Sequence, residues 1–67
     1  MSNAIEFYEN DKMKYTFKGV GNFHEGNFIN IEQVTYIIRR VTFCLDHVDP
    51  QMDTILRCNV DIERVTP

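Results

Sequence analysis

Residues 29–48, INIEQVTYIIRRVTFCLDHV, constrain the fold more than any other part of the chain. Their composition is typical of β-strands, but their apolar residues are spaced like those of a helix. Placed at about 100° per residue, the apolar positions fall within an arc of roughly 140° that contains no polar side chain. These positions are Ile31, Val34, Ile37, Ile38, Val41, Cys44, Leu45 and Val48.

Signals at both ends of the same stretch also indicate a helix. Asn30 is a suitable N-cap and Glu32 follows in the first turn. His47 would lie in the last turn, with Pro50 just beyond it. The β-branched and aromatic residues oppose a helix, but burying the apolar stripe at about 25 cal/mol per Å² offsets a penalty of that size. We therefore predict one amphipathic helix over about residues 30–48.

A β-hairpin is predicted before this helix. Residues 5–8 and 13–17 are rich in strand formers and are separated by a polar turn. A three-residue loop, residues 10–12, would place Phe7 opposite Tyr15 and Ile5 opposite Phe17. The apolar side chains of the hairpin would then share one face.

A third strand is predicted near the end of the chain. Residues 54–63 alternate apolar with polar side chains, and the inward positions are Leu56, Cys58, Val60 and Ile62. The predicted order is β-β-α-β, an α+β fold in which one helix covers one face of a small antiparallel sheet. The alternative divides residues 34–48 into two strands broken at the arginines and gives a small all-β barrel or half-barrel.

The length and the cysteines limit the class of protein. A chain of 67 residues is long enough for a single domain with a thin core. Residues 5–67 are assigned to this domain, whereas Met-Ser-Asn-Ala at residues 1–4 resembles a disordered tail or a scar of tag removal. Cys44 and Cys58 have neither CxxC spacing nor a nearby histidine pair, so we expect two reduced cysteines and a cytoplasmic protein. The sequence shows neither an apolar run of about 18 residues nor a signal peptide, and no membrane association is expected.

Catalytic and cofactor chemistry is not indicated. His24 and Glu25 lie in a glycine-bearing loop, where binding groups are often found. One histidine beside one acid supplies neither a nucleophile nor a metal-ligand set. The glycines match neither a dinucleotide fingerprint nor a P-loop. We therefore expect no enzyme, no catalytic residue, no metal and no cofactor.

A row of lysines is the candidate nucleic-acid contact. Lys12, Lys14 and Lys18 occur along the second predicted strand, and Tyr8 would stand beside Lys14. Lysines with an interleaved aromatic residue can follow a phosphate backbone and stack on a base. The net charge of −3 and the acids expected on the same face favour the simpler interpretation, in which the lysines protect a sheet edge.

The other face of the predicted helix is the candidate protein interface. Tyr36 and Phe43 are seven residues apart and would both point away from the core. Arg39 and Arg40 would flank them, and aromatic residues with arginine are enriched at protein interfaces. The sequence therefore predicts a non-catalytic interaction or regulatory module that forms a homodimer or binds a protein partner through this face. The alternative is a small nucleic-acid-binding regulator.

Overall fold

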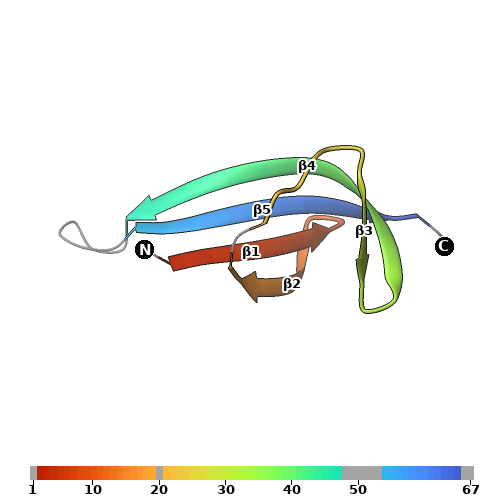
Figure 1. Cartoon of the computed structure of the whole chain (residues 1–67), viewed down its shortest axis with the longest axis horizontal. Coiled ribbons are helices and arrows are strands. Elements are labelled where there is room, and N and C mark those ends of the chain that lie inside the picture. The colour runs from red at the N-terminus through yellow and green to blue at the C-terminus, as the bar shows by residue number, and fades with distance from the viewer. Residues whose placement is uncertain (1, 20, 48–53, 66–67) are drawn as a thin grey trace.

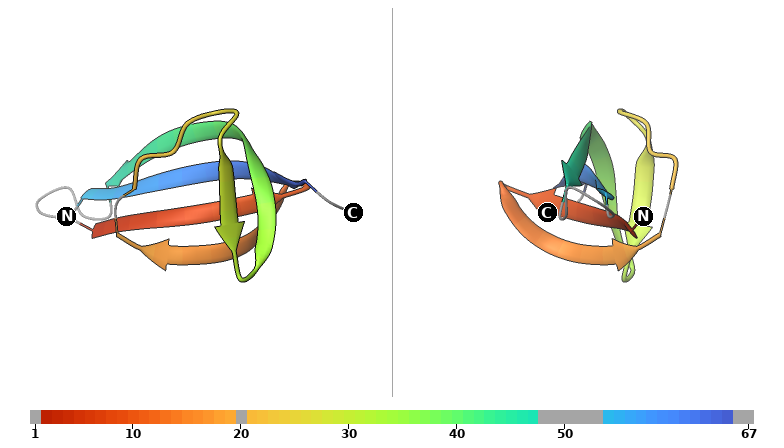
Figure 2. Two further views of the ribbon diagram at one scale, coloured as in Figure 1. Left: turned by 45° about the vertical axis from the view of Figure 1, so that its right-hand side comes forward. Right: turned by 90° about the vertical axis from the view of Figure 1, so that its left-hand side faces the viewer.

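The computed structural model describes residues 2–19, 21–47 and 54–65, and within these ranges the chain forms five β-strands and no helix. They form one sheet in the order β2-β1-β5-β4-β3, in which β1 and β5 are parallel and the other neighbours are antiparallel. The sheet curls into a half-barrel whose two edge strands are β2 and β3 (Figures 1 and 2). The strands are β1 (Ser2–Glu9), β2 (Lys12–Lys18), β3 (Phe28–Ile31), β4 (Val34–His47) and β5 (Thr54–Arg64).

The prediction of an α+β fold is therefore wrong, and the all-β half-barrel alternative is confirmed. The segment predicted as a helix, residues 30–48, contains the end of β3, a turn at Glu32 and Gln33, and the whole of β4. The predicted third strand is confirmed as β5, and it pairs with β4 and β1 at the centre of the sheet.

A β-bulge at Arg39 explains why β4 resembles a helix in the sequence. Ile38 pairs with Ile62 and Arg40 pairs with Asp61, which leaves Arg39 as an extra residue. Because side chains alternate along a strand, the bulge moves the inward positions from even to odd residue numbers. The inward positions of β4 are thus Val34, Tyr36, Ile38 and then Val41, a mixed spacing that imitates the helical period.

The β1–β2 hairpin has the predicted apolar pairs but a different turn and a different pairing next to the turn. Phe7 pairs with Tyr15 and Ile5 pairs with Phe17, as expected. The turn has two residues, Asn10 at φ 53° and Asp11 at φ 64°, and not three. Both values are typical of the type I′ turn that suits the twist of a hairpin. A register shift between Phe7 and Tyr8 compensates for the shorter turn and pairs Tyr8 with Met13, not Lys14.

The core lies on the concave face of the sheet. Of the four inward residues predicted on β5, three are buried and Leu56 is half-buried. The loop between β2 and β3 passes across this face (Figure 1), and the Phe23 ring packs edge-on against Phe7 at 5.6 Å between ring centroids. This loop and the curl of the sheet bury the face that a helix was expected to cover. The buried apolar residues are Ile5, Phe7, Ile31, Tyr36, Ile38, Cys58, Val60 and Ile62.

The cysteines are free, as predicted, and neighbouring strands hold them on opposite faces. Cys58 pairs with Phe43, whereas Cys44 pairs with Arg57 on the convex face. Cys58 is buried, and this burial raises the pKa of its thiol. Side chains on opposite faces cannot adopt disulfide geometry.

The turn between β3 and β4 carries backbone strain that can be removed by mutation. Glu32 at φ 50° and Gln33 at φ 69° both occupy the left-handed region without a glycine or asparagine. We expect Glu32→Asn/Gln33→Gly to raise the free energy of unfolding by roughly 1 kcal/mol, measured by urea denaturation, because Asn-Gly favours this turn. Glu32→Gln is the control, since it removes the charge and keeps the strain. A gain equal to that of the double variant would show that charge, not backbone conformation, limits stability.

Candidate functional site

The residues predicted to form one interface are separated by the fold. Tyr36 is fully buried, whereas Phe43 is 63% exposed. Arg39 lies at the bulge and its Nε donates a 2.6 Å hydrogen bond to Glu63. Arg40 is opposite Asp61 on the convex face, away from Phe43. The predicted interface on an outer helix face is therefore wrong: the segment is a strand, and although the bulge puts Tyr36 and Phe43 on the same concave face, Tyr36 is buried and Phe43 is exposed.

The predicted nucleic-acid contacts are only partly available. Lys14 donates a 2.7 Å hydrogen bond to Glu9, so its charge is paired. The Tyr8 hydroxyl donates to Glu6 at 3.2 Å. Lys12 and Lys18 are exposed, and neither forms an ion pair with any residue that the structure describes.

The loop residues His24 and Glu25 do not form a recognisable reaction centre. Both are exposed, and the His24 carbonyl accepts a 3.2 Å hydrogen bond from the Asn27 amide. Within residues 2–19, 21–47 and 54–65, no group of three or more histidine, cysteine or acidic side chains could hold a metal ion. The sequence prediction of a non-enzymatic protein stays a prediction.

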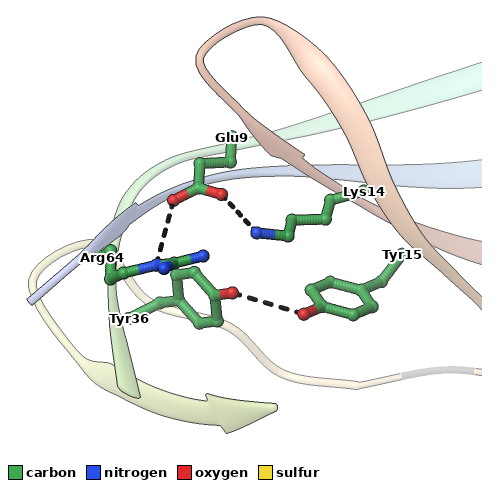
Figure 3. Close-up of polar contacts among 5 residues, drawn as sticks. All are labelled: Glu9, Lys14, Tyr15, Tyr36 and Arg64. Carbon is green, nitrogen blue, oxygen red and sulfur yellow. Dashed lines mark hydrogen bonds and ion pairs between the residues drawn. The ribbon is translucent and has the colours of Figure 1, made fainter. Parts of the chain in front are cut away.

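Ionic and aromatic side chains from four strands form a cluster around Tyr36 (Figure 3). Glu9 lies between two cations, with Lys14 Nζ at 2.7 Å and Arg64 Nε at 3.7 Å. Both cations lie over the ring of Tyr36, at 5.7 Å and 6.0 Å from its centroid. The hydroxyl groups of Tyr36 and Tyr15 are 3.3 Å apart. The cluster joins β1, β2, β4 and β5, which no local sequence pattern could show.

The pKa values in this cluster move in directions that its contacts explain. The hydrogen bond with Tyr15 lowers the pKa of Tyr36, with Lys14 and Arg64 acting in the same direction against the effect of burial. The same bond raises the pKa of Tyr15, and either hydroxyl group can be its donor. The Lys14 hydrogen bond lowers the pKa of Glu9, and Glu9 raises the pKa of Lys14. Because Tyr36 is fully buried, we interpret the cluster as structural.

This interpretation predicts a pH-dependent effect of Glu9→Gln. The pKa of Glu9 is lower in the folded chain, so its contribution to stability is present above the ordinary carboxyl pKa of 4.5 and is lost as pH falls through the folded value. We expect the variant to melt at a lower temperature than the wild type near neutral pH, and the difference to shrink in acid. Glu63→Gln is the control, because its partner Arg39 is 59% exposed and the pair adds little. A difference in melting temperature that does not change with pH would contradict an ionic role for Glu9.

An apolar surface on the outer half of β4 is the strongest candidate for binding. Phe43 is 63% and Leu45 is 60% exposed. They follow Val41 on the concave face, where Phe43 pairs with Cys58 and Leu45 pairs with Leu56. We call Phe43, Leu45 and Leu56 the arm surface. Phe43 was expected to be exposed but Leu45 was assigned to the core, because alternation over residues 41–45 predicts a shared face only once the segment is known to be a strand.

Concave regions of the described surface lie on both faces of the sheet. An apolar pocket of about 390 Å³ lies at the open seam between the β1–β2 hairpin and β3. A polar depression of about 290 Å³ lies on the convex face and includes Tyr8, Arg40 and Asp61. The seam pocket is lined by Ile5, Phe7, Phe17, Phe23, Ile29, Asn30, Ile31 and Glu32.

Comparisons with known proteins found no matching family model, no similar curated protein and no similar solved structure. A search of the described residues for helices long and apolar enough to cross a membrane found none.

Proposed function

We propose that this chain is a non-catalytic protein-interaction module whose partner binds the arm surface. The observation that supports the proposal is the pair of large apolar side chains, Phe43 and Leu45, each at least 60% exposed and adjacent on one face of a strand. Contiguous apolar patches on small proteins usually mark a binding surface. The proposed compartment is the cytoplasm, which agrees with two free cysteines.

The charge pattern supports a protein partner over a nucleic acid. Four of the seven basic side chains lie within 4.0 Å of an acidic group, namely Lys14, Arg39, Arg57 and Arg64. A surface that holds a phosphate backbone needs cations free to replace counterions. The arm surface instead offers an aromatic and an aliphatic side chain, which suit the apolar centre of a protein interface.

Photo-crosslinking tests this proposal in the cells that produce the protein. Benzoylphenylalanine placed at position 45 should form a light-dependent adduct of one defined mass, whereas the same group at the exposed position 16 on β2 should not. Adding Phe43→Lys to the position 45 variant should abolish the adduct, because a charge disrupts an apolar contact. Equal labelling from both positions, or an adduct that survives Phe43→Lys, would overturn the proposal.

A small nucleic-acid-binding regulator is the second candidate function. The observation that favours it is a pair of exposed lysines on edge strand β2, Lys12 and Lys18, which form no ion pair with a described residue. It predicts binding of labelled single-stranded or duplex DNA or RNA that weakens as salt is added, measured by fluorescence anisotropy. Lys12→Ala and Lys18→Ala should each reduce the salt slope by about 1. No binding at low salt would exclude this function.

A further inference from the structure

Among the residues that the structure describes, the sheet has two edge strands, β2 and β3, and both carry the usual protection against pairing with another chain. Edge strand β2 carries Lys12, Lys14 and Lys18 together with a register shift in its pairing. Edge strand β3 has only 4 residues. Lysines, bulges and short length are the devices that keep sheet edges from associating.

The outer half of β4 is the unprotected edge. β3 pairs with β4 only as far as Ile37, and the loop before β3 adds backbone hydrogen bonds at Ile38. Beyond the bulge, β4 continues beside β5 to His47, and no described strand lies on its other side. Residues 41–45, VTFCL, contain no charge, no proline and no further bulge. Two residues of the arm surface, Phe43 and Leu45, lie on this free edge.

We propose that two copies of this chain pair antiparallel through residues 40–46 of β4 about a two-fold axis, joining two half-barrels into one continuous sheet. The proposal rests on the proposed function and identifies the partner as a second copy. A strand paired with itself about a two-fold axis forms a self-complementary interface, because each contact occurs twice. Addition of a strand to a free edge is a common mode of protein recognition.

The sequence of β4 selects one register for this pairing. A two-fold axis perpendicular to the sheet keeps each side chain on its own face, and directly opposed residues of an antiparallel pair also share a face. Because faces alternate along a strand, opposed residues must be separated by an even number of positions. The axis must therefore pass through a residue and not between two residues. An axis at Phe43 places each Phe43 opposite its copy and each Val41 opposite Leu45. The same register places Arg40 opposite residue 46 of the second copy, an aspartate. An axis at Thr42 would instead place Leu45 opposite Arg39, and an axis at Cys44 would place Val41 opposite His47. Only the register centred on Phe43 matches apolar with apolar and a cation with an acid.

Sedimentation velocity over a range of concentrations tests the dimer. We expect a reversible dimer with a dissociation constant on the order of 10 μM, because a short strand pair belongs among the small, weak interfaces. Phe43→Lys should weaken association at least tenfold. The matched control is Phe28→Lys, since Phe28 is 66% exposed on β3 and lies outside the proposed pairing. Circular dichroism melts of each variant verify folding.

A charge exchange tests the register. Arg40→Asp alone and Asp46→Arg alone should each weaken the dimer, because like charges then face each other across the axis. The double variant Arg40→Asp/Asp46→Arg should restore association. A wild type that stays monomeric, a dimer that survives Phe43→Lys, or a double variant no better than the single ones would overturn the proposal. A monomer that still gives the adduct from position 45 with a different protein would overturn only the dimer and would leave the proposed function intact.

Discussion

The register shift at Arg39 is the constraint on which the rest of the structure depends. β4 is the longest strand, and it forms both the wall of the half-barrel and the extension that carries the arm surface. Without the extra residue, Ile38 and Val41 would face opposite sides of the sheet, and one of them would leave the core. The bulge also bends and twists the strand, as bulges generally do. A curved strand allows a single apolar face to pack against itself.

Curvature replaces the second layer that a sheet of this size usually needs. In most small domains a helix or another sheet covers the apolar face. Here Phe23 in the β2–β3 loop contacts Phe7 across the concave side, and Lys14 and Arg64 lie over the buried ring of Tyr36. The apolar concave face is fully covered only in the closed part of the half-barrel. Where β4 extends beyond it, the same face continues outward and exposes Phe43 and Leu45.

The candidate site was only partly accessible from the sequence. Phe43 was correctly identified as an exposed aromatic residue, because it is exposed in the strand as it would be in the helix. Tyr36 was placed on the surface but is fully buried, because the strand period puts it beside Ile38. The pairing of Glu9 with Arg64 could not be inferred, since it joins residues from the first and last strands.

Local alternation by itself determined the apolar pairs Phe7–Tyr15 and Ile5–Phe17 and the inward face of β5, because a period of two requires no distant partner. The same sequence left β4 ambiguous between helix and strand, since a bulged strand and an amphipathic helix leave similar apolar spacings. Pairing with β5 decided this ambiguity through backbone hydrogen bonds that no local propensity encodes. Tertiary structure alone also decided which apolar residues are buried and which are exposed, because that depends on where the curved sheet ends.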